Sequence, residues 1–528
     1  MLLEIKNLKV KYFGSESGKN AVDGASFGME KGKVLALVGE SACGKTTTAL
    51  SIARLITSHD GKIEDGEIIF KGKDVMHLSN LELRMLRASE ISYIFQDPSS
   101  SLNPVYTIGE QIAEILAVHK KIPGPDAKQK VLNALREAHL SDAERIFSAY
   151  PHQLSGGMKQ RAMIAMAAIL KPALLIADEP TSALDVSVQA KIMQLLMELK
   201  LKLGLSILFI THNLNLVSEI ADNVAVMYNG KIVEACSKDD FYNAPKHEYT
   251  KMLISTMKDL NAMKRFPVNS VSSGKNPPQN APILKANNLK KSFCAGKKCI
   301  RAVSGVDINL GYGETLGIVG ETGCGKTTLA KLLAGLYRPD EGTILYNGSP
   351  KMIRKNIQMV FQHPYDSLNP RMKIGDMLKE CLITHKIARQ DKIPQRLKAL
   401  LDMVQLPECS LDRYPHEFSG GERQRIAITR ALAVEPKLII LDEPVSSLDV
   451  SIQGKILHLL LNLQKELGLS YIFISHDILI VKAISDRIAV MRDGKITEEG
   501  PAGQICENPV QEYTKQLMNA ASCAILKT

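Results

Sequence analysis

Short apolar runs alternate with stretches of helical periodicity along most of the chain. Six runs of four or five residues are typical of buried strands: Val34–Val38, Leu174–Ala177, Ile207–Ile210, Leu316–Val319, Leu438–Leu441 and Tyr471–Ile474. Between the second and third runs, apolar residues recur at the spacing of one helix face, at Ile192, Leu195, Leu196, Leu199 and Leu203. Strands that alternate with helices predict an α/β fold with a mostly parallel sheet.

The polar motifs that follow these runs occur twice. Residues 39–46 (GESACGKT) return as 320–327 (GETGCGKT), and the motifs around Gln96, Ser155, Glu179 and His212 return around Gln362, Ser419, Glu443 and His476. The offset is 281 residues from Lys45 to Lys326, 266 from Gln96 to Gln362, and 264 from Ser155 to Ser419 and beyond. The chain therefore contains two copies of one domain, and the first copy has extra residues between its lysine and its glutamine.

A segment of different composition separates the copies. Residues 258–282 contain four Pro, four Asn and three Ser, and they show neither a helical nor a strand period. Such a segment is typical of an exposed, semi-flexible linker. We expect a first domain at residues 1–257, a linker at 258–282 and a second domain at 283–528.

Composition narrows the class of protein. The 528 residues are 45% hydrophobic and 23% charged, which predicts packed cores rather than disorder. No apolar run approaches the roughly 18 residues that span a bilayer, and Glu4 interrupts the apolar N-terminus, unlike a signal peptide. We therefore expect an intracellular chain without membrane spans. The net charge of +10 suits an anionic partner such as a nucleotide, a nucleic acid or a lipid surface.

The cysteines do not suggest a disulfide framework. There are nine, an odd number, and they are scattered without a Cys-x-x-Cys pair. Cys294 and Cys299 are the closest two, in a basic segment that we interpret as a loop. We expect them to be free thiols rather than metal ligands.

The glycine-rich motif after the first strand of each copy has the spacing of a phosphate-binding loop. Backbone N–H groups of such a loop turn toward phosphate, and the following helix adds its positive end. Lys45 and Lys326 would reach the β and γ phosphates, and Thr46 and Thr327 would bind Mg²⁺. We interpret the cysteines inside the two loops, Cys43 and Cys324, as packing residues.

Acidic pairs end a later strand in each copy. In Asp178-Glu179 and in Asp442-Glu443, the aspartate suits a Mg²⁺ site and the glutamate suits a base that polarises the attacking water. A Ser-Gly-Gly segment lies 24 residues before each glutamate, at Ser155 and Ser419, and precedes a basic helical stretch. A serine hydroxyl and N–H groups at a helix start can bind phosphate.

Together these motifs resemble the ATP-binding cassette (ABC) family over nearly the whole chain. The resemblance implies an α/β fold of two tandem nucleotide-binding domains, each with a phosphate-loop core, N-terminal antiparallel strands and a helical signature subdomain. It implies that Glu179, His212, Glu443 and His476 are catalytic. Of these, His212 and His476 match the family's switch histidines. It places Mg²⁺ at Thr46, Gln96 and Asp178 in the first copy, and at Thr327, Gln362 and Asp442 in the second. Gln96 and Gln362 match the family's Q-loop.

The same resemblance assigns the ATP-binding residues. In the first copy they are Tyr12, Gly39, Glu40, Ser41, Ala42, Cys43, Gly44, Lys45, Thr46, Thr47, Gln96, Ser155, Gly156, Gly157 and Asp185. In the second they are Phe293, Gly320, Glu321, Thr322, Gly323, Cys324, Gly325, Lys326, Thr327, Thr328, Gln362, Ser419, Gly420, Gly421 and Asp449. Tyr12 and Phe293 match the aromatic residue that stacks on adenine.

The family pairs two cassettes head to tail, so each ATP would lie between one phosphate loop and the opposite signature. The first loop would pair with Ser419, and the second with Ser155. Three departures are mild: Met158 and Glu422 replace the usual signature glutamine, and Ala42 stands where the second copy has Gly323. Glu422 would bring a carboxylate near the nucleotide of the first loop.

A finer resemblance is to the ATPase subunits of bacterial oligopeptide, dipeptide and nickel importers. It rests on residues 96–104 and 362–370 and on the tails 244–250 (APKHEYT) and 508–514 (NPVQEYT). It implies a peripheral protein at the cytoplasmic face of the inner membrane that works with two permease subunits and an extracytoplasmic substrate-binding protein. It does not define the solute, which could be a peptide, a metal complex or another small molecule.

Two other functions remain open at this point. The net charge also suits a soluble tandem cassette protein that acts on ribosomes or nucleic acid. Those factors resemble one another in a long charged helical linker, which residues 258–282 do not match, so we expect no nucleic acid partner. The ATPase of an exporter is disfavoured by the two similar tails.

Overall fold

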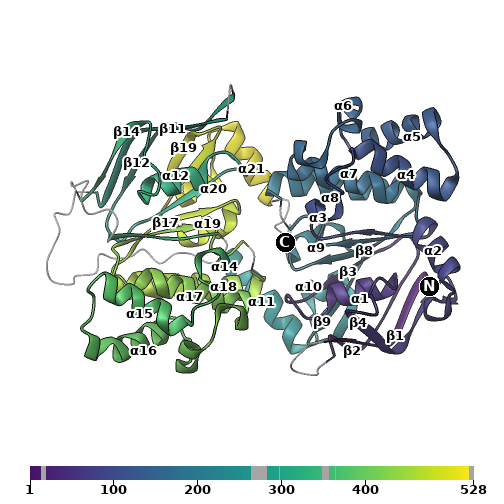
Figure 1. Ribbon diagram of the computed structural model, residues 1–528, viewed down its shortest axis with the longest axis horizontal. Coiled ribbons are helices and arrows are strands. Elements are labelled where there is room, and N and C mark those ends of the chain that lie inside the picture. Colours follow the sequence, from purple (N-terminus) through teal and green to yellow (C-terminus); the bar gives the residue numbers. More distant parts are fainter. Residues whose placement is uncertain are drawn as a thin grey trace. The chain divides into compact units, whose positions relative to one another are not determined.

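The computed structural model describes residues 1–13, 20–182, 184–262, 282–295, 298–347, 356–362, 364–446 and 448–522. These residues divide into two compact units, Met1–Ser255 and Thr256–Ser522 (Figure 1). Most of the predicted linker lies outside the described residues, so its boundaries stay a prediction. No described helix is long and apolar enough to cross a membrane.

The first unit contains two sheets and their helices. Its strands are β1 (Leu3–Tyr12), β2 (Val22–Met29), β3 (Val34–Val38), β4 (Gly61–Phe70), β5 (Lys73–Asp74), β6 (Ile91–Ile94), β7 (Leu174–Asp178), β8 (Ser206–Thr211), β9 (Asn223–Tyr228) and β10 (Lys231–Ser237). Its α-helices are α1 (Lys45–Ile52), α2 (Asn80–Ser89), α3 (Pro98–Ser101), α4 (Ile108–Lys120), α5 (Gly124–Glu137), α6 (Ala143–Phe147), α7 (Gly156–Ala168), α8 (Val186–Leu203), α9 (Leu214–Ile220), α10 (Lys238–Asn243) and α11 (Glu248–Ala262).

The central sheet has the order β10-β9-β3-β8-β7-β6 and is parallel except for β10. Its middle strands are buried along their whole length, because both faces are covered. Side chains of β3 alternate between two cores: Leu35 and Leu37 pack with α1 and the antiparallel sheet β2-β1-β4-β5, and Val34 packs with the helices on the other face. This confirms the predicted α/β class.

The second unit repeats this plan. Its strands are β11 (Leu284–Ala295), β12 (Lys298–Leu310), β13 (Thr315–Val319), β14 (Glu341–Tyr346), β15 (Ile357–Val360), β16 (Leu438–Asp442), β17 (Ser470–Ser475), β18 (Arg487–Arg492) and β19 (Lys495–Pro501). Its described α-helices are α12 (Lys326–Leu333), α14 (Pro364–Ser367), α15 (Ile374–Thr384), α16 (Ile393–Met403), α17 (Gly420–Leu432), α18 (Val450–Leu467), α19 (Ile478–Ile484), α20 (Ala502–Glu507) and α21 (Glu512–Ser522). The six-stranded sheet has the order β15-β16-β17-β13-β18-β19, and the antiparallel sheet has the order β12-β11-β14.

Each unit carries a helical subdomain that ends in a serine-capped helix. In the first unit α4 and α5 pack against α7, and α6 packs against α4 and α5 (Figure 1). In the second unit α15 and α16 pack against α17. Part of the extra sequence of the first copy falls between β4 and β6, in a connection that contains β5, a 3₁₀ turn and α2. The phosphate loops and the acidic pairs lie outside these helical subdomains, at the carboxyl ends of the parallel strands.

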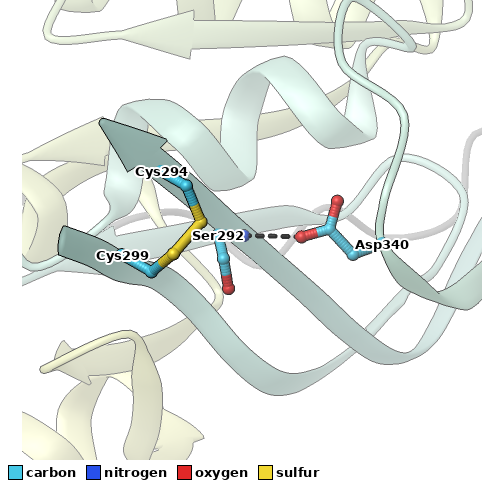
Figure 2. Close-up of a disulfide and its surroundings, with 4 residues drawn as sticks. All are labelled: Ser292, Cys294, Cys299 and Asp340. Atoms are coloured by element: carbon cyan, nitrogen blue, oxygen red, sulfur yellow. Dashed lines mark hydrogen bonds between the residues drawn. A yellow bond between two sulfur atoms is a disulfide. The ribbon is translucent and has the colours of Figure 1, made fainter. Parts of the chain in front are cut away.

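The expectation that Cys294 and Cys299 are free thiols is wrong. The two residues form a disulfide between β11 and β12, as Figure 2 shows. Cys294 lies on β11 and Cys299 on β12 rather than in a loop, and the register of the antiparallel pair sets Cys294 directly opposite Cys299. Nearby, Asp340 accepts a hydrogen bond from the backbone N–H of Ser292 at 2.7 Å and anchors the same hairpin (Figure 2).

Candidate active site

The first phosphate loop connects β3 to α1 and requires glycine at its tightest points. Gly39 has φ of 155°, and a Cβ atom there would lie 2.2 Å from the carbonyl oxygen of Met227. Gly44 has φ of 106°, and its Cβ would lie 2.5 Å from the carbonyl oxygen of Ala21. The loop therefore passes so close to neighbouring backbone that larger residues cannot replace these glycines.

The side chain of Lys45 is buried, with 5% exposed, and is held inside its own loop. Its Nζ donates to the carbonyl oxygens of Gly39 at 2.8 Å and Glu40 at 2.7 Å, and lies 3.9 Å from Sγ of Cys43. Within the described residues it forms no ion pair with a carboxylate. A buried ammonium group whose partners are neutral dipoles suits an incoming phosphate.

The acidic pair at the end of β7 faces this loop. Oδ1 of Asp178 accepts from the hydroxyl of Thr46 at 3.2 Å, and Oδ2 accepts from the phenol of Tyr93 at 2.9 Å. Glu179 has φ of 45°, a left-handed conformation that is costly for a residue with a side chain. This turn directs its carboxylate toward two further predicted residues.

Those residues are Gln96 and His212. Nε2 of Gln96 donates to Oε2 of Glu179 at 3.0 Å, and Nδ1 of His212 lies 3.0 Å from Oε1. Burial on its own would raise the pKa of Glu179, but the hydrogen bond and charge of His212, together with the charge of Lys45, lower that pKa below its usual value. The carboxylate is therefore ionised at neutral pH, as a group that orients or deprotonates water must be.

The second unit has the same arrangement. Nζ of Lys326 donates to the carbonyl oxygens of Gly320 at 2.7 Å and Glu321 at 2.9 Å. Glu443, with φ of 47°, accepts from Nε2 of Gln362 at 3.0 Å and lies 3.2 Å from Nδ1 of His476. Burial raises the pKa of Glu443, and the hydrogen bond and charge of His476 lower it by more, so that it ends below the usual value.

The aspartates of the two pairs differ in their partners. Thr327 donates to Asp442 at 3.3 Å, but Met359 occupies the position that Tyr93 has in the first unit. Burial raises the pKa of Asp442 to about 6. Burial also raises the pKa of Asp178, where the hydrogen bonds from Tyr93 and Thr46 oppose it.

Comparison with known proteins agrees with this geometry. Residues 22–182 and 303–446 match the ABC transporter family. The chain belongs to this family. Residues 233–285 also match the C-terminal region of oligopeptide/dipeptide transporters. As an ABC protein, the chain is an ATPase that binds ATP.

Individual relatives cover almost the whole chain. The glutathione import ATP-binding protein GsiA of Pectobacterium atrosepticum is 40% identical, over 99% of this chain and 90% of that protein. The protein of the same name in Escherichia coli strain K12 is 41% identical, with the same shares covered. Among solved structures, cbiO1 from Clostridium perfringens, part of the ABC transporter complex cbiONQ, is 31% identical, covering 43% of this chain and 92% of that one, with a TM-score of 0.39.

The two serines predicted to belong to the ABC signature lie at helix starts. Ser155 precedes α7, and its hydroxyl accepts from the N–H of Met158 at 3.4 Å. Ser419 precedes α17, and its hydroxyl accepts from the N–H of Glu422 in the same way. Here the carboxylate of Glu422 also accepts two hydrogen bonds, from the backbone N–H of Ser419 at 2.9 Å and from its hydroxyl at 2.8 Å. Asp185 and Asp449, which we predict to be ATP-binding residues, precede α8 and α18.

The two predicted adenine-stacking residues have different surroundings. The phenol of Tyr12 lies 3.4 Å from the hydroxyl of Thr47, beside the phosphate loop. Phe293 lies on the disulfide-linked hairpin, 43% exposed, with its ring centroid 5.6 Å from that of Tyr337. An exposed aromatic ring is available to stack on a base.

Sequence reasoning missed three tyrosines that contact the site. Tyr93 bonds Asp178, and the hydroxyls of Tyr249 and Tyr513 accept from backbone N–H groups of the two phosphate loops. The Tyr-Thr pairs at 249–250 and 513–514 were visible in the sequence as a shared tail. That signal did not show which residues the tails contact.

Proposed function

We propose that this chain is the ATP-hydrolysing subunit of a bacterial ABC importer that takes up peptides or a similar small solute. The observation that carries the proposal is the double constellation: each unit presents a lysine, an ionised glutamate and a histidine in the same geometry. The match of residues 233–285 to oligopeptide/dipeptide transporters supports a peptide solute. The relatives named for glutathione import support the direction of transport and a small peptide.

The site residues divide the chemistry between them. Lys45 and Lys326 exchange their backbone carbonyl partners for the phosphates of ATP, and the loop N–H groups bind the remaining oxygens. Glu179 and Glu443 polarise the attacking water, with His212 and His476 holding each carboxylate in place. A phosphate oxygen carries negative charge and a carbonyl oxygen does not. Each lysine therefore forms a stronger hydrogen bond to phosphate than to its present carbonyl partners.

The oxygen donors beside each phosphate loop suit Mg²⁺. Thr46 and Asp178 lie in hydrogen-bond contact, as do Thr327 and Asp442, and hydroxyl and carboxylate oxygens are the ligands this cation prefers. These pairs would hold the ion, with Gln96 and Gln362 as further oxygen donors. A bound Mg²⁺ would neutralise charge on the β and γ phosphates.

We further propose that the two units pair head to tail, as the ABC family does. The phosphate loop that contains Lys45 would then meet Ser419, and the loop that contains Lys326 would meet Ser155. ATP would close this pair, and hydrolysis would open it. Two separate permease subunits would receive that motion through the segments after Gln96 and Gln362, at the cytoplasmic face of the inner membrane, and an extracytoplasmic binding protein would deliver the solute.

The experiment that tests the proposal is affinity capture of the Glu179→Gln, Glu443→Gln protein from its own cells in mild detergent. This variant should retain ATP and stay bound to its partners. Recovery of two multi-spanning membrane proteins would support the importer function. Recovery of ribosomal proteins without membrane proteins would overturn it in favour of a translation factor.

A further inference from the structure

The tail of the first unit is fixed to β10 by one carboxylate. Glu234, on β10, accepts hydrogen bonds from the backbone N–H groups of Lys246 at 2.9 Å and His247 at 3.0 Å, just before α11. A carboxylate at a helix start both binds free N–H groups and faces the positive end of the helix dipole. The first turn of α11 is therefore held in one place, and Tyr249 lies in that turn.

From there the hydroxyl of Tyr249 reaches the phosphate loop. It accepts a hydrogen bond from the backbone N–H of Glu40 at 3.1 Å, across 209 positions of sequence. The carbonyl group of that same peptide unit belongs to Gly39 and accepts from Nζ of Lys45 at 2.8 Å. One peptide plane is thus held at both ends, by the tail tyrosine and by the lysine.

The second unit forms the same chain of contacts. Glu498 accepts from the N–H groups of Val510 at 2.8 Å and Gln511 at 3.1 Å, ahead of α21. The hydroxyl of Tyr513 accepts from the N–H of Glu321 at 3.2 Å, and the carbonyl of Gly320 accepts from Nζ of Lys326 at 2.7 Å.

The surroundings of the two tyrosine rings differ although the hydroxyl contacts agree. Tyr228 stacks on Tyr249 with ring centroids 4.3 Å apart, whereas Arg492 lies over the ring of Tyr513 at 4.7 Å. Ring packing has therefore changed between the copies, and the bond to the loop has not. Burial raises the pKa of Tyr513 to about 12, so its phenol stays protonated at neutral pH.

We propose that Tyr249 and Tyr513 are positioning residues for ATP, each fixing the peptide unit that holds the phosphate-loop lysine. This inference rests on the proposed function in one respect, that the two loops bind the phosphates of ATP. When phosphate draws the lysine away from the carbonyl of Gly39 or Gly320, that peptide loses its strongest partner. The tyrosine hydroxyl keeps this peptide from rotating and closing the loop. Tyr249 lies within residues 233–285, so in the first unit the region that matches the C-terminal region of oligopeptide/dipeptide transporters would set nucleotide affinity.

Removal of the hydroxyl alone tests the proposal. Tyr249→Phe is made in the Lys326→Ala chain, where the first loop is the remaining tight site for MgATP. Tyr513→Phe is made in the Lys45→Ala chain, where the second loop is the remaining tight site. MgATP affinity, measured by calorimetric titration of the full chain, should fall about threefold to tenfold in each, the effect of one hydrogen bond. In the otherwise unchanged chain the KM for ATP should rise while kcat at saturating ATP stays within about twofold.

Each unit provides a matched control. Tyr242 donates to the carbonyl of Leu214, and Tyr471 donates to that of Leu460, both away from the loops. Tyr242→Phe and Tyr471→Phe remove an equally buried hydroxyl and should leave ATP affinity unchanged. A merely structural role for Tyr249 and Tyr513 would instead lower the melting temperature and the number of binding sites, with unchanged affinity at the sites that remain.

The outcomes separate this inference from the proposed function. If Lys45→Ala and Lys326→Ala leave MgATP binding intact, the assignment of the phosphate loops is wrong. If the lysine variants weaken binding but both Tyr→Phe variants match their controls, only the positioning role is refuted. The two tyrosines are independent tests, because a folding defect in one variant leaves the other to decide.

Discussion

The two units share the geometry of their proposed catalytic groups but differ in the groups that surround them. Lysine, glutamate, glutamine and histidine have the same partners in both. The differences lie one contact further out. Tyr93 donates to Asp178, whereas Met359 has no phenol to offer Asp442. The carboxylate of Glu422 accepts from Ser419, whereas the side chain of Met158 has no such group for Ser155. In the proposed function both sites hydrolyse ATP, and these outer contacts would tune each site separately.

The largest effect should come from removing the catalytic carboxylates. Glu179→Gln with Glu443→Gln should lower ATPase turnover at least about a hundredfold, because no ionised group then polarises the water. Each single variant should retain the turnover of the other site, so the two residual rates measure how unequal the sites are. Parental turnover in the double variant would refute the assignment of both bases.

The phosphate-loop lysines should produce the next largest effect. Lys45→Ala or Lys326→Ala should weaken MgATP binding at its own site by about tenfold to a hundredfold, since a charged hydrogen bond to phosphate is lost. Equilibrium titration would show one weakened site and one normal site in each variant. Weakening of both sites by either change would mean that the sites cannot be treated as separate.

A smaller effect should follow from exchanging the signature residues. If the first loop meets Ser419, Glu422→Met frees that hydroxyl for phosphate and should raise turnover severalfold in the Glu443→Gln background. Met158→Glu should lower turnover in the Glu179→Gln background. Glu422→Gln is the control, because glutamine keeps the reciprocal cap without the charge. Opposite changes in rate would contradict the proposed pairing.

The smallest effect concerns backbone strain in the two loops. Ala42 has φ of 62° where Gly323 has φ of 85°, and only glycine adopts this region without cost. Ala42→Gly should stabilise the folded first unit by about 1 kcal/mol, and Gly323→Ala should destabilise the second by a similar amount. Thermal unfolding of the full chains would detect both shifts, which should have opposite signs.

The sequence predicted the α/β fold because each strand and glycine turn is a local pattern. Lys45, Thr46, Asp178 and Glu179 were found for the same reason: their spacing and their place at strand ends are visible without coordinates. The role of each site residue stays a prediction, although the structure brings Gln96 and His212 to the carboxylate of Glu179.

Other contacts were out of reach of the sequence. The bond between Tyr249 and Glu40 joins residues that only the folded tail brings together, and no periodicity marks it. The Cys294–Cys299 disulfide depends on the register of two strands, which the local sequence does not define. Tertiary packing, rather than local pattern, decides both.

The most direct test of the account is the number of ATP molecules bound by the Glu179→Gln, Glu443→Gln chain. Native mass spectrometry of the full chain with MgATP measures it without relying on turnover. Two complete constellations predict two bound ATP molecules per chain. One bound ATP, or none, would contradict the claim that both units are working nucleotide sites.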